Sequence, residues 1–116
     1  MNRIINLTGK PVVMVDHHHK VTAVFPVSGI QLWQDQDVHD VEAINGEGKP
    51  ATYMQVTMSP MRGLPKPSED TKYIVTARIA SAARKASRST DDMLITEAEV
   101  RSPDGEHIGW GQLLEL

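Results

Sequence analysis

The chain has 116 residues, of which 40% are hydrophobic and 23% are charged, so its composition is that of one globular domain spanning residues 1–116. The absence of cysteine excludes disulfides, thiolate catalysis and cysteine-ligated metal centres. A formal net charge of -3 and only 4% aromatic residues argue against general nucleic-acid binding by phosphate neutralisation or base stacking. No apolar run approaches a membrane span and no signal-peptide core is visible, so we expect a cytoplasmic protein without membrane contact.

The N-terminal third of the sequence predicts β structure. Residues 12–15 form a short run rich in branched apolar side chains, and residues 21–25 alternate between apolar and smaller or polar ones. The polar segment Asp16-His17-His18-His19-Lys20 separates these runs, so we predict a hairpin with this segment at its tip. Residues 30–34 also alternate and predict a further strand.

A second hairpin is predicted around Asn45-Gly46, the dipeptide most typical of tight hairpin turns. Residues 38–44 precede this dipeptide and residues 51–58 follow it, both with strand composition. The residues from Glu47 to Pro50 lengthen the connection, so the register of the hairpin stays open. The three prolines of residues 59–68 then predict a long extended loop within the same domain.

The alanine-rich segment 77–88 predicts the one helix of the chain. It lies between apolar strands expected at 73–76 and 93–96, a strand-helix-strand arrangement whose parallel pairing stays open. A final hairpin is predicted within residues 100–113, around the turn residues Ser102-Pro103-Asp104-Gly105. We therefore predict an α+β fold, a β-rich curved sheet or partly closed barrel of about seven short strands with one covering helix.

Several short segments support a family resemblance when they are taken together. They are Ile5-Asn6-Leu7-Thr8 with Pro11-Val12, Gly63-Leu64-Pro65-Lys66-Pro67, Tyr73-Ile74-Val75-Thr76, and Arg101 with the segment Gly105-Glu106-His107-Ile108-Gly109. This layout resembles small uncharacterised proteins of bacteriophages and bacterial genomes, which share an INLT-x-HPV opening, GLP-x-P, YIVS and a closing R-x-x-x-G-x-x-IG hairpin. Lys10 stands where that opening has histidine, so no role built on that histidine carries over. The resemblance implies a phage or mobile-element accessory protein in the host cytoplasm, and it implies no activity.

The histidine-rich segment 16–20 offers metal-binding side chains. Neighbouring residues in extended backbone point to opposite faces, so only His17 and His19 could share a cation. A closed site needs further ligands, such as His39 or His107, and the sequence spacing does not predict that they come close. We interpret the segment as an exposed hairpin tip and expect no metal and no cofactor.

Two adjacent carboxylates, Asp91 and Asp92, follow the predicted helix. We interpret them as ion-pairing with Arg88 or Arg84, or as turn-forming residues. The alternative is a small metal-dependent hydrolase that uses both carboxylates with a histidine. No serine elbow, Walker loop, dinucleotide loop or HExxH motif is present, so we assign no catalytic residue and favour a non-enzymatic protein without excluding an enzyme.

Positive charge is concentrated on the predicted helix, opposite its small apolar residues. Such a basic face can bind a phosphate-bearing ligand or an acidic protein surface, although a merely solvated helix exterior is the alternative. We therefore expect an accessory protein that binds and neutralises a host component, either a defence protein or a phosphate-containing signalling molecule. A second alternative is a structural or assembly protein whose exposed strands pair with further copies, a possible homo-oligomer. The expected partner- or anion-binding residues are Arg62, Arg78, Arg84, Lys85, Arg88 and Arg101.

Overall fold

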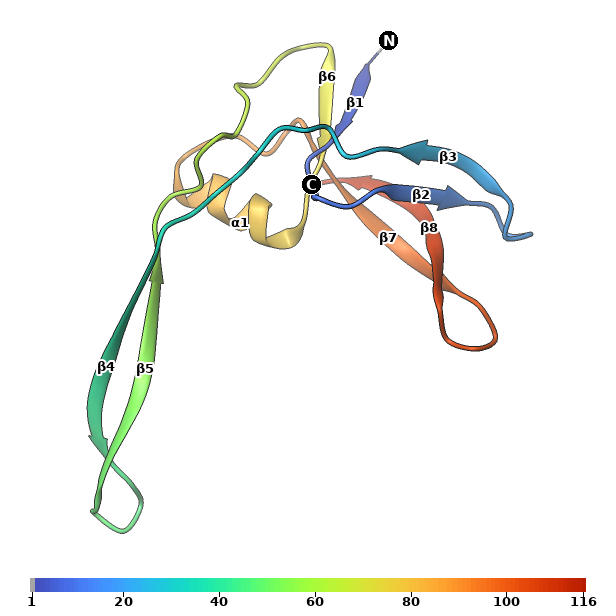
Figure 1. The fold of residues 1–116 in the computed structure, drawn as a ribbon. Helices are drawn as coiled ribbons and strands as arrows, with labels where there is room; N and C mark the ends of the chain where they lie inside the picture. Colours follow the sequence, from blue (N-terminus) through green and yellow to red (C-terminus); the bar gives the residue numbers. More distant parts are fainter. Residues whose placement is uncertain (1) are drawn as a thin grey trace.

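The computed structural model describes residues 2–116, which form eight strands and one helix in two separate β-sheets. The elements are β1 (Arg3–Asn6), β2 (Val12–Val15), β3 (Val21–Phe25), β4 (Gln36–Ile44), β5 (Pro50–Met58), β6 (Thr71–Ile74), α1 (Ala77–Lys85), β7 (Met93–Arg101) and β8 (His107–Glu115). A mixed six-stranded sheet has the order β1-β6-β7-β8-β2-β3, and β4 and β5 form a two-stranded sheet of their own (Figure 1). The predicted α+β class is confirmed. The larger sheet is open, and the division into two sheets was not predicted.

The strand-helix-strand unit is a parallel crossover. Tyr73 and Ile74 of β6 pair with Met93 and Leu94 of β7, and α1 connects the two strands. This answers the question that the sequence left open. Strand β1 adds to the other side of β6, also in parallel, so the N-terminus of the chain lies at one edge of the sheet (Figure 1).

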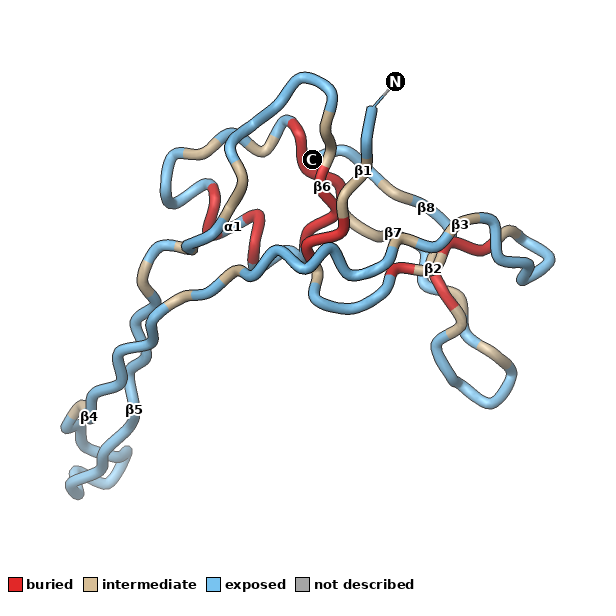
Figure 2. Tube along the Cα trace, turned by 45° about the horizontal axis from the view of Figure 1, so that its top comes forward, coloured by how far each residue is buried: buried red, intermediate tan, exposed pale blue. Residues whose placement is uncertain are grey.

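The core lies on both sides of β6. Tyr73 and Val75 face α1 and pack against its buried residues Ile79, Ala80 and Ala83. The alanines are small, so the helix axis can approach the sheet closely. Ile74 points to the opposite face, where it packs with Val12 and Met14 of β2. In Figure 2 the buried residues accordingly gather in α1, β6 and β2.

The helix ends at Lys85, three residues before the predicted end. Ser87 takes the left-handed backbone conformation at φ 59°, which stops the helix. The amide of Arg88 donates to the carbonyl oxygen of Ala83 at 2.9 Å, and that of Ser87 to Arg84 at 3.0 Å. This pair of bonds is the Schellman arrangement, and it turns Arg88 off the helical face on which the sequence pattern had placed it.

The strand predicted at residues 30–34 is absent, and a strand not predicted, β1, is present. Leu32 and Gln34 are half-buried and Trp33 between them is exposed, as in an alternating strand. Within residues 2–116, however, the segment has a single bridge partner, Arg62, opposite Trp33. An alternating segment becomes a strand only where a neighbouring strand provides a hydrogen-bond ladder. The short β1 has such a neighbour in β6.

All three predicted hairpins are present and have closely similar loops. In each, the first loop residue donates its amide to the carbonyl of the fifth and accepts from the amide of the fourth. The side-chain oxygen of that first residue also accepts a backbone amide, which is typical of Asp, Asn and Ser in turns. These first residues are Asp16, Asn45 and Ser102, and the fourth residues are His19, Gly48 and Gly105, all with positive φ. The glycine that the second turn requires is therefore Gly48, not Gly46 of the predicted dipeptide.

The hairpin of β4 and β5, here called the arm, projects away from the rest of the molecule (Figure 1). Every residue of its two strands except Val41 is exposed. The Cα radius of gyration is 18.9 Å, whereas a compact chain of this length has about 13 Å. The arm thus adds length to the molecule and contributes nothing to the core.

Candidate functional site

Three of the six cations predicted to bind a partner are neutralised within the chain. Arg62 lies 3.3 Å from a carboxylate oxygen of Asp35, and Arg101 forms an exposed ion pair of 2.6 Å with Glu99. Arg88 forms an ion pair with Asp92 in which both side chains are nearly buried. Because their charges are compensated, these three arginines add no free positive charge to that of α1.

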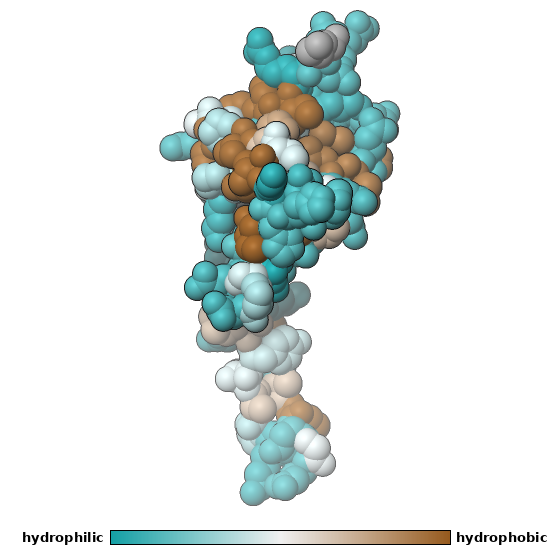
Figure 3. Space-filling view, turned by 90° about the vertical axis from the view of Figure 1, so that its right-hand side faces the viewer, coloured by the Kyte–Doolittle hydropathy of each residue, from teal (hydrophilic) through white to brown (hydrophobic). Residues whose placement is uncertain are grey.

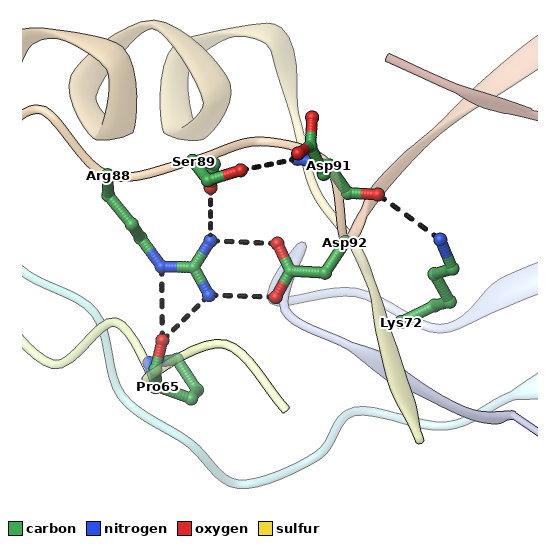
Figure 4. A network of polar contacts seen from close by, with 6 residues as sticks. All are labelled: Pro65, Lys72, Arg88, Ser89, Asp91 and Asp92. Carbon is green, nitrogen blue, oxygen red and sulfur yellow. Dashed lines mark hydrogen bonds and ion pairs between the residues drawn. The ribbon is translucent and has the colours of Figure 1, made fainter. Parts of the chain in front are cut away.

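Arg88 holds together the loop before β6 and the turn before β7 (Figure 4). Its two terminal nitrogens donate to the two carboxylate oxygens of Asp92, each at 2.9 Å. Its Nε and Nη2 donate to the carbonyl oxygen of Pro65 at 3.1 and 2.8 Å, and its Nη1 donates to that of Ser89 at 2.7 Å. The side chain is saturated with protein acceptors, which makes Arg88 a structural bridge. The predicted ion pair of Asp92 with Arg88 is confirmed.

The other three cations, Arg78, Arg84 and Lys85, all belong to α1, and within residues 2–116 none of them is in an ion pair. Nε of Arg78 donates to Oε1 of Gln34 at 3.2 Å, and Nε2 of Gln34 donates to the carbonyl oxygen of Ser59 at 2.9 Å. Gln34 carries no charge, so it orients Arg78 and leaves the positive charge uncompensated.

Two adjoining cavities lie beside α1 and share Gln34 and Arg78, and together they are here called the α1 groove. The larger, of ≈ 920 Å³, lies between the start of α1 and the extended segment before the arm. The smaller, of ≈ 250 Å³, continues toward the base of the arm and is lined by Lys85. No Asp or Glu among residues 2–116 lines either cavity. Arg84 is exposed on the same helix but lines neither.

Trp33 forms one wall of the larger cavity and is 52% exposed. Its position is fixed by two backbone hydrogen bonds with Arg62, of 3.1 and 2.8 Å. Gly63 follows with φ 88°, and a Cβ there would lie 2.3 Å from the carbonyl oxygen of Gln31 and 3.1 Å from the Trp33 ring. The glycine of the Gly63-Leu64-Pro65 motif therefore shapes the groove wall. Sequence reasoning missed Trp33; the only signal was a large aromatic residue that the alternation of residues 30–34 directs away from the core.

The N-terminus of α1 opens onto the same cavity. Thr76 caps the helix, and its Oγ1 accepts from the amide of Ile79 at 3.2 Å. The first turn contains no acidic residue, so the partial positive charge of the helix end adds to that of Arg78 instead of being cancelled. The groove is thus a mainly apolar surface with positive charge at one end.

The histidine-rich segment is a hairpin tip, as predicted. Oδ1 of Asp16 accepts the amides of His18 at 2.8 Å and Lys20 at 3.0 Å. The hydrogen bond from Lys20 is the main cause that lowers the pKa of the Asp16 carboxyl, against the opposing effect of desolvation. In the described part of the chain, no three His, Asp or Glu side chains are close enough to hold a metal ion. His39 and His107 belong to the arm and to β8, so they are not brought to the tip.

Within residues 2–116 the chain contains no helix of the length and apolar character that crossing a bilayer requires. Scans against protein-family models, curated proteins and solved structures found no match to this chain.

Proposed function

We propose that the protein is a non-enzymatic binding protein that sequesters an anionic ligand in the α1 groove. The observation that carries this proposal is that Arg78 and Lys85 line the groove while no described carboxylate does, in a chain of net charge -3. Excess negative charge elsewhere makes an uncompensated pair of cations in one hollow unusual. An anion bound there gains charge-assisted hydrogen bonds without first displacing an internal ion pair.

The lining of the groove indicates the kind of anion. Phosphate groups fit the planar donors of Arg78 and the ammonium of Lys85, and the exposed ring of Trp33 can stack on a planar apolar group. These features together favour a phosphate-containing molecule with a base-like ring over a small inorganic ion. The family resemblance, which rests on the sequence motifs alone, adds the role of a phage or mobile-element accessory protein. Capture of a phosphate-containing signalling molecule is then the means of neutralising a host component.

Titration of the protein with nucleoside monophosphates, cyclic nucleotides and inorganic phosphate, followed by isothermal calorimetry, tests the proposal. We expect binding of at least one nucleotide, weakened about 10-fold or more in Arg78→Gln and in Lys85→Gln. Arg84→Gln is the matched control, because it removes the same charge from the same helix outside the groove, and we expect less than a 3-fold effect. Absence of binding by every compound, or an equal loss in all three variants, overturns the assignment.

The alternative of a metal-dependent hydrolase gains no support from the geometry. Asp92 is held by Arg88, and Asp91 is exposed beside it, with its backbone oxygen accepting from Lys72 at 3.2 Å (Figure 4). The two carboxylates therefore do not converge on a common point, as acid-base or metal chemistry requires. The assembly alternative has a specific observation in its favour, the exposed arm.

A further inference from the structure

The arm is a two-stranded sheet that no other element among residues 2–116 covers. An isolated hairpin of this kind is marginally stable in water, and sheets of three or more strands are normally needed. The chain exposes 8266 Å², whereas a folded monomer of 12.8 kDa exposes roughly 6,300 Å². The excess of roughly 2,000 Å² is ample for the share that one subunit buries in a standard interface. Area and strand number both indicate that the arm is covered in the assembled state.

The two edges of the arm differ in chemistry. Strand β4 carries three carboxylates, Asp37, Asp40 and Glu42, and natural proteins use such charges to protect an edge from pairing. Residues 51–58 of β5 contain no charged residue, no glycine and no proline. The register from Gln36↔Met58 to Ile44↔Pro50 is continuous, so no bulge interrupts the β5 edge. The β4 edge is therefore protected from strand pairing by its charges, whereas the β5 edge is free to pair.

The side chains of β5, like its backbone edge, are suited to pairing with a further strand. Thr52, Met54, Val56 and Met58 share one face of the strand, and Met54 and Val56 are 66% and 48% exposed. Figure 3 shows weakly polar and apolar side chains along the arm between the body and a hydrophilic tip. A neighbouring strand of the same composition would cover these side chains by cross-strand packing.

We infer that β5 pairs antiparallel with β5 of a second copy about a two-fold axis, forming one four-stranded sheet of order β4-β5-β5-β4. Charge selects this arrangement. Pairing through β4 would place the carboxylates of two copies about 5 Å apart, whereas pairing through β5 keeps the two β4 strands about 14 Å apart, beyond the Debye length of about 8 Å. The outer edges of the joined sheet are the two β4 strands, whose carboxylates oppose further pairing, so assembly ends at the dimer.

Sedimentation and light scattering over a range of protein concentrations test the dimer, and hydrogen exchange tests which edge forms it. We expect a dimer in which amides of β5 that point away from β4 are protected, while the outward amides of β4 exchange rapidly. A protein that stays monomeric up to high micromolar concentration overturns the inference. So does a dimer in which the outward amides of β5 and β4 exchange equally fast.

Lysine substitutions distinguish β5 from the rest of the arm. The double variant M54K/V56K places two charges on the proposed edge, and each occurs twice in the dimer, so we expect the dissociation constant to rise at least about 100-fold. The matched control is V38K/I44K, which adds the same charge to the same face of the hairpin on β4. Both pairs of residues are exposed and outside the core, so the body folds in either case, as circular dichroism will report. Equal weakening by the two variants contradicts pairing through β5. Since these residues lie outside the α1 groove, nucleotide titration of both variants separates failure of the dimer from failure of the proposed function.

Discussion

Arg88 and Asp92 form a two-pronged ion pair in which both hydrogen bonds measure 2.9 Å and the side chains are only 12% and 11% exposed. The pair lies where the chain leaves α1 and enters β7, and the same guanidinium holds the carbonyl oxygen of Pro65. One side chain therefore joins the turn between α1 and β7 to the loop at Pro65, 23 residues earlier in the sequence. Removing one member of such a pair is strongly destabilising, because the other charge then stays buried without a partner.

We expect Arg88→Ala to lower the free energy of unfolding by about 3–5 kcal/mol. Asp92 then stays buried without its partner, and the Pro65 carbonyl also loses its donors. Chemical denaturation measures the loss, and Arg101→Ala serves as the control because its ion pair with Glu99 is exposed, with an expected effect of about 0–1 kcal/mol. Equal effects of the two substitutions would show that the buried pair is not a major source of stability.

The position of Ser87 yields a second prediction. Its φ of 59° is a conformation that glycine adopts without the steric cost of a Cβ. We expect Ser87→Gly to raise the free energy of unfolding by about 0.5–1 kcal/mol, the usual gain for a glycine at this helix-ending position. In the helix interior, Ser81→Gly should have the opposite sign, a loss of about 0.3–0.5 kcal/mol. Thermal unfolding of the two variants compares them directly. A loss of stability in Ser87→Gly would contradict the role assigned to its backbone conformation.

The carboxyl of Asp16 predicts a pH dependence. Its pKa lies below the ordinary 3.8 because the folded state offers backbone amides, chiefly that of Lys20, to the ionised form. A group with a lowered pKa contributes stability above its unfolded pKa, and the contribution is lost as pH falls through the folded pKa. The stability difference between the wild type and Asp16→Asn should therefore shift against the wild type as pH falls below 3.8. Unfolding curves recorded on both sides of that value measure it. A difference independent of pH would show that the carboxylate charge has no part in the turn.

The parts of the fold that were predictable are those determined by neighbouring residues. Turn residues at Asp16, Asn45 and Ser102 act within five residues, so all three hairpins could be located from the sequence. Strand β1 and the bridge between Trp33 and Arg62 depend on partners far away in the chain, which local patterns do not contain.

The candidate site was predictable only in part for the same reason. The excess of cations on α1 was visible in the sequence, but the prediction that Arg88 belongs to this basic face was wrong. The left-handed residue Ser87 ends the helix before Arg88. Trp33 and Arg78 line one cavity because Arg78 donates a hydrogen bond to Gln34, the neighbour of Trp33, and because the loop at Gly63 lies close to Gln31. Both contacts join segments that are far apart in the sequence. Helical periodicity alone therefore identified some of the charges but not the hollow that they line.

Gly63 provides the last prediction, because its substitution changes the groove without removing a charge. A Cβ at this position would meet the Gln31 carbonyl oxygen at 2.3 Å, so Gly63→Ala must displace the segment that carries Trp33. Gly105→Ala is the matched control, since its φ of 84° is similar, nothing lies within 4 Å of the added Cβ, and the residue does not line the α1 groove. Both variants incur the strain of a left-handed alanine, about 1–2 kcal/mol, and only Gly63→Ala adds the clash.

We expect hydrogen exchange to show faster opening at the Trp33 amide in Gly63→Ala, with β6 and β7 still protected. The emission of Trp33 should also change, and a Trp110→Phe background isolates this signal because the chain has two tryptophans. Nucleotide binding by the α1 groove should weaken in Gly63→Ala and persist in Gly105→Ala. If both variants opened the Trp33 segment equally, the backbone conformation and not the close approach at Gly63 would determine the shape of the groove wall.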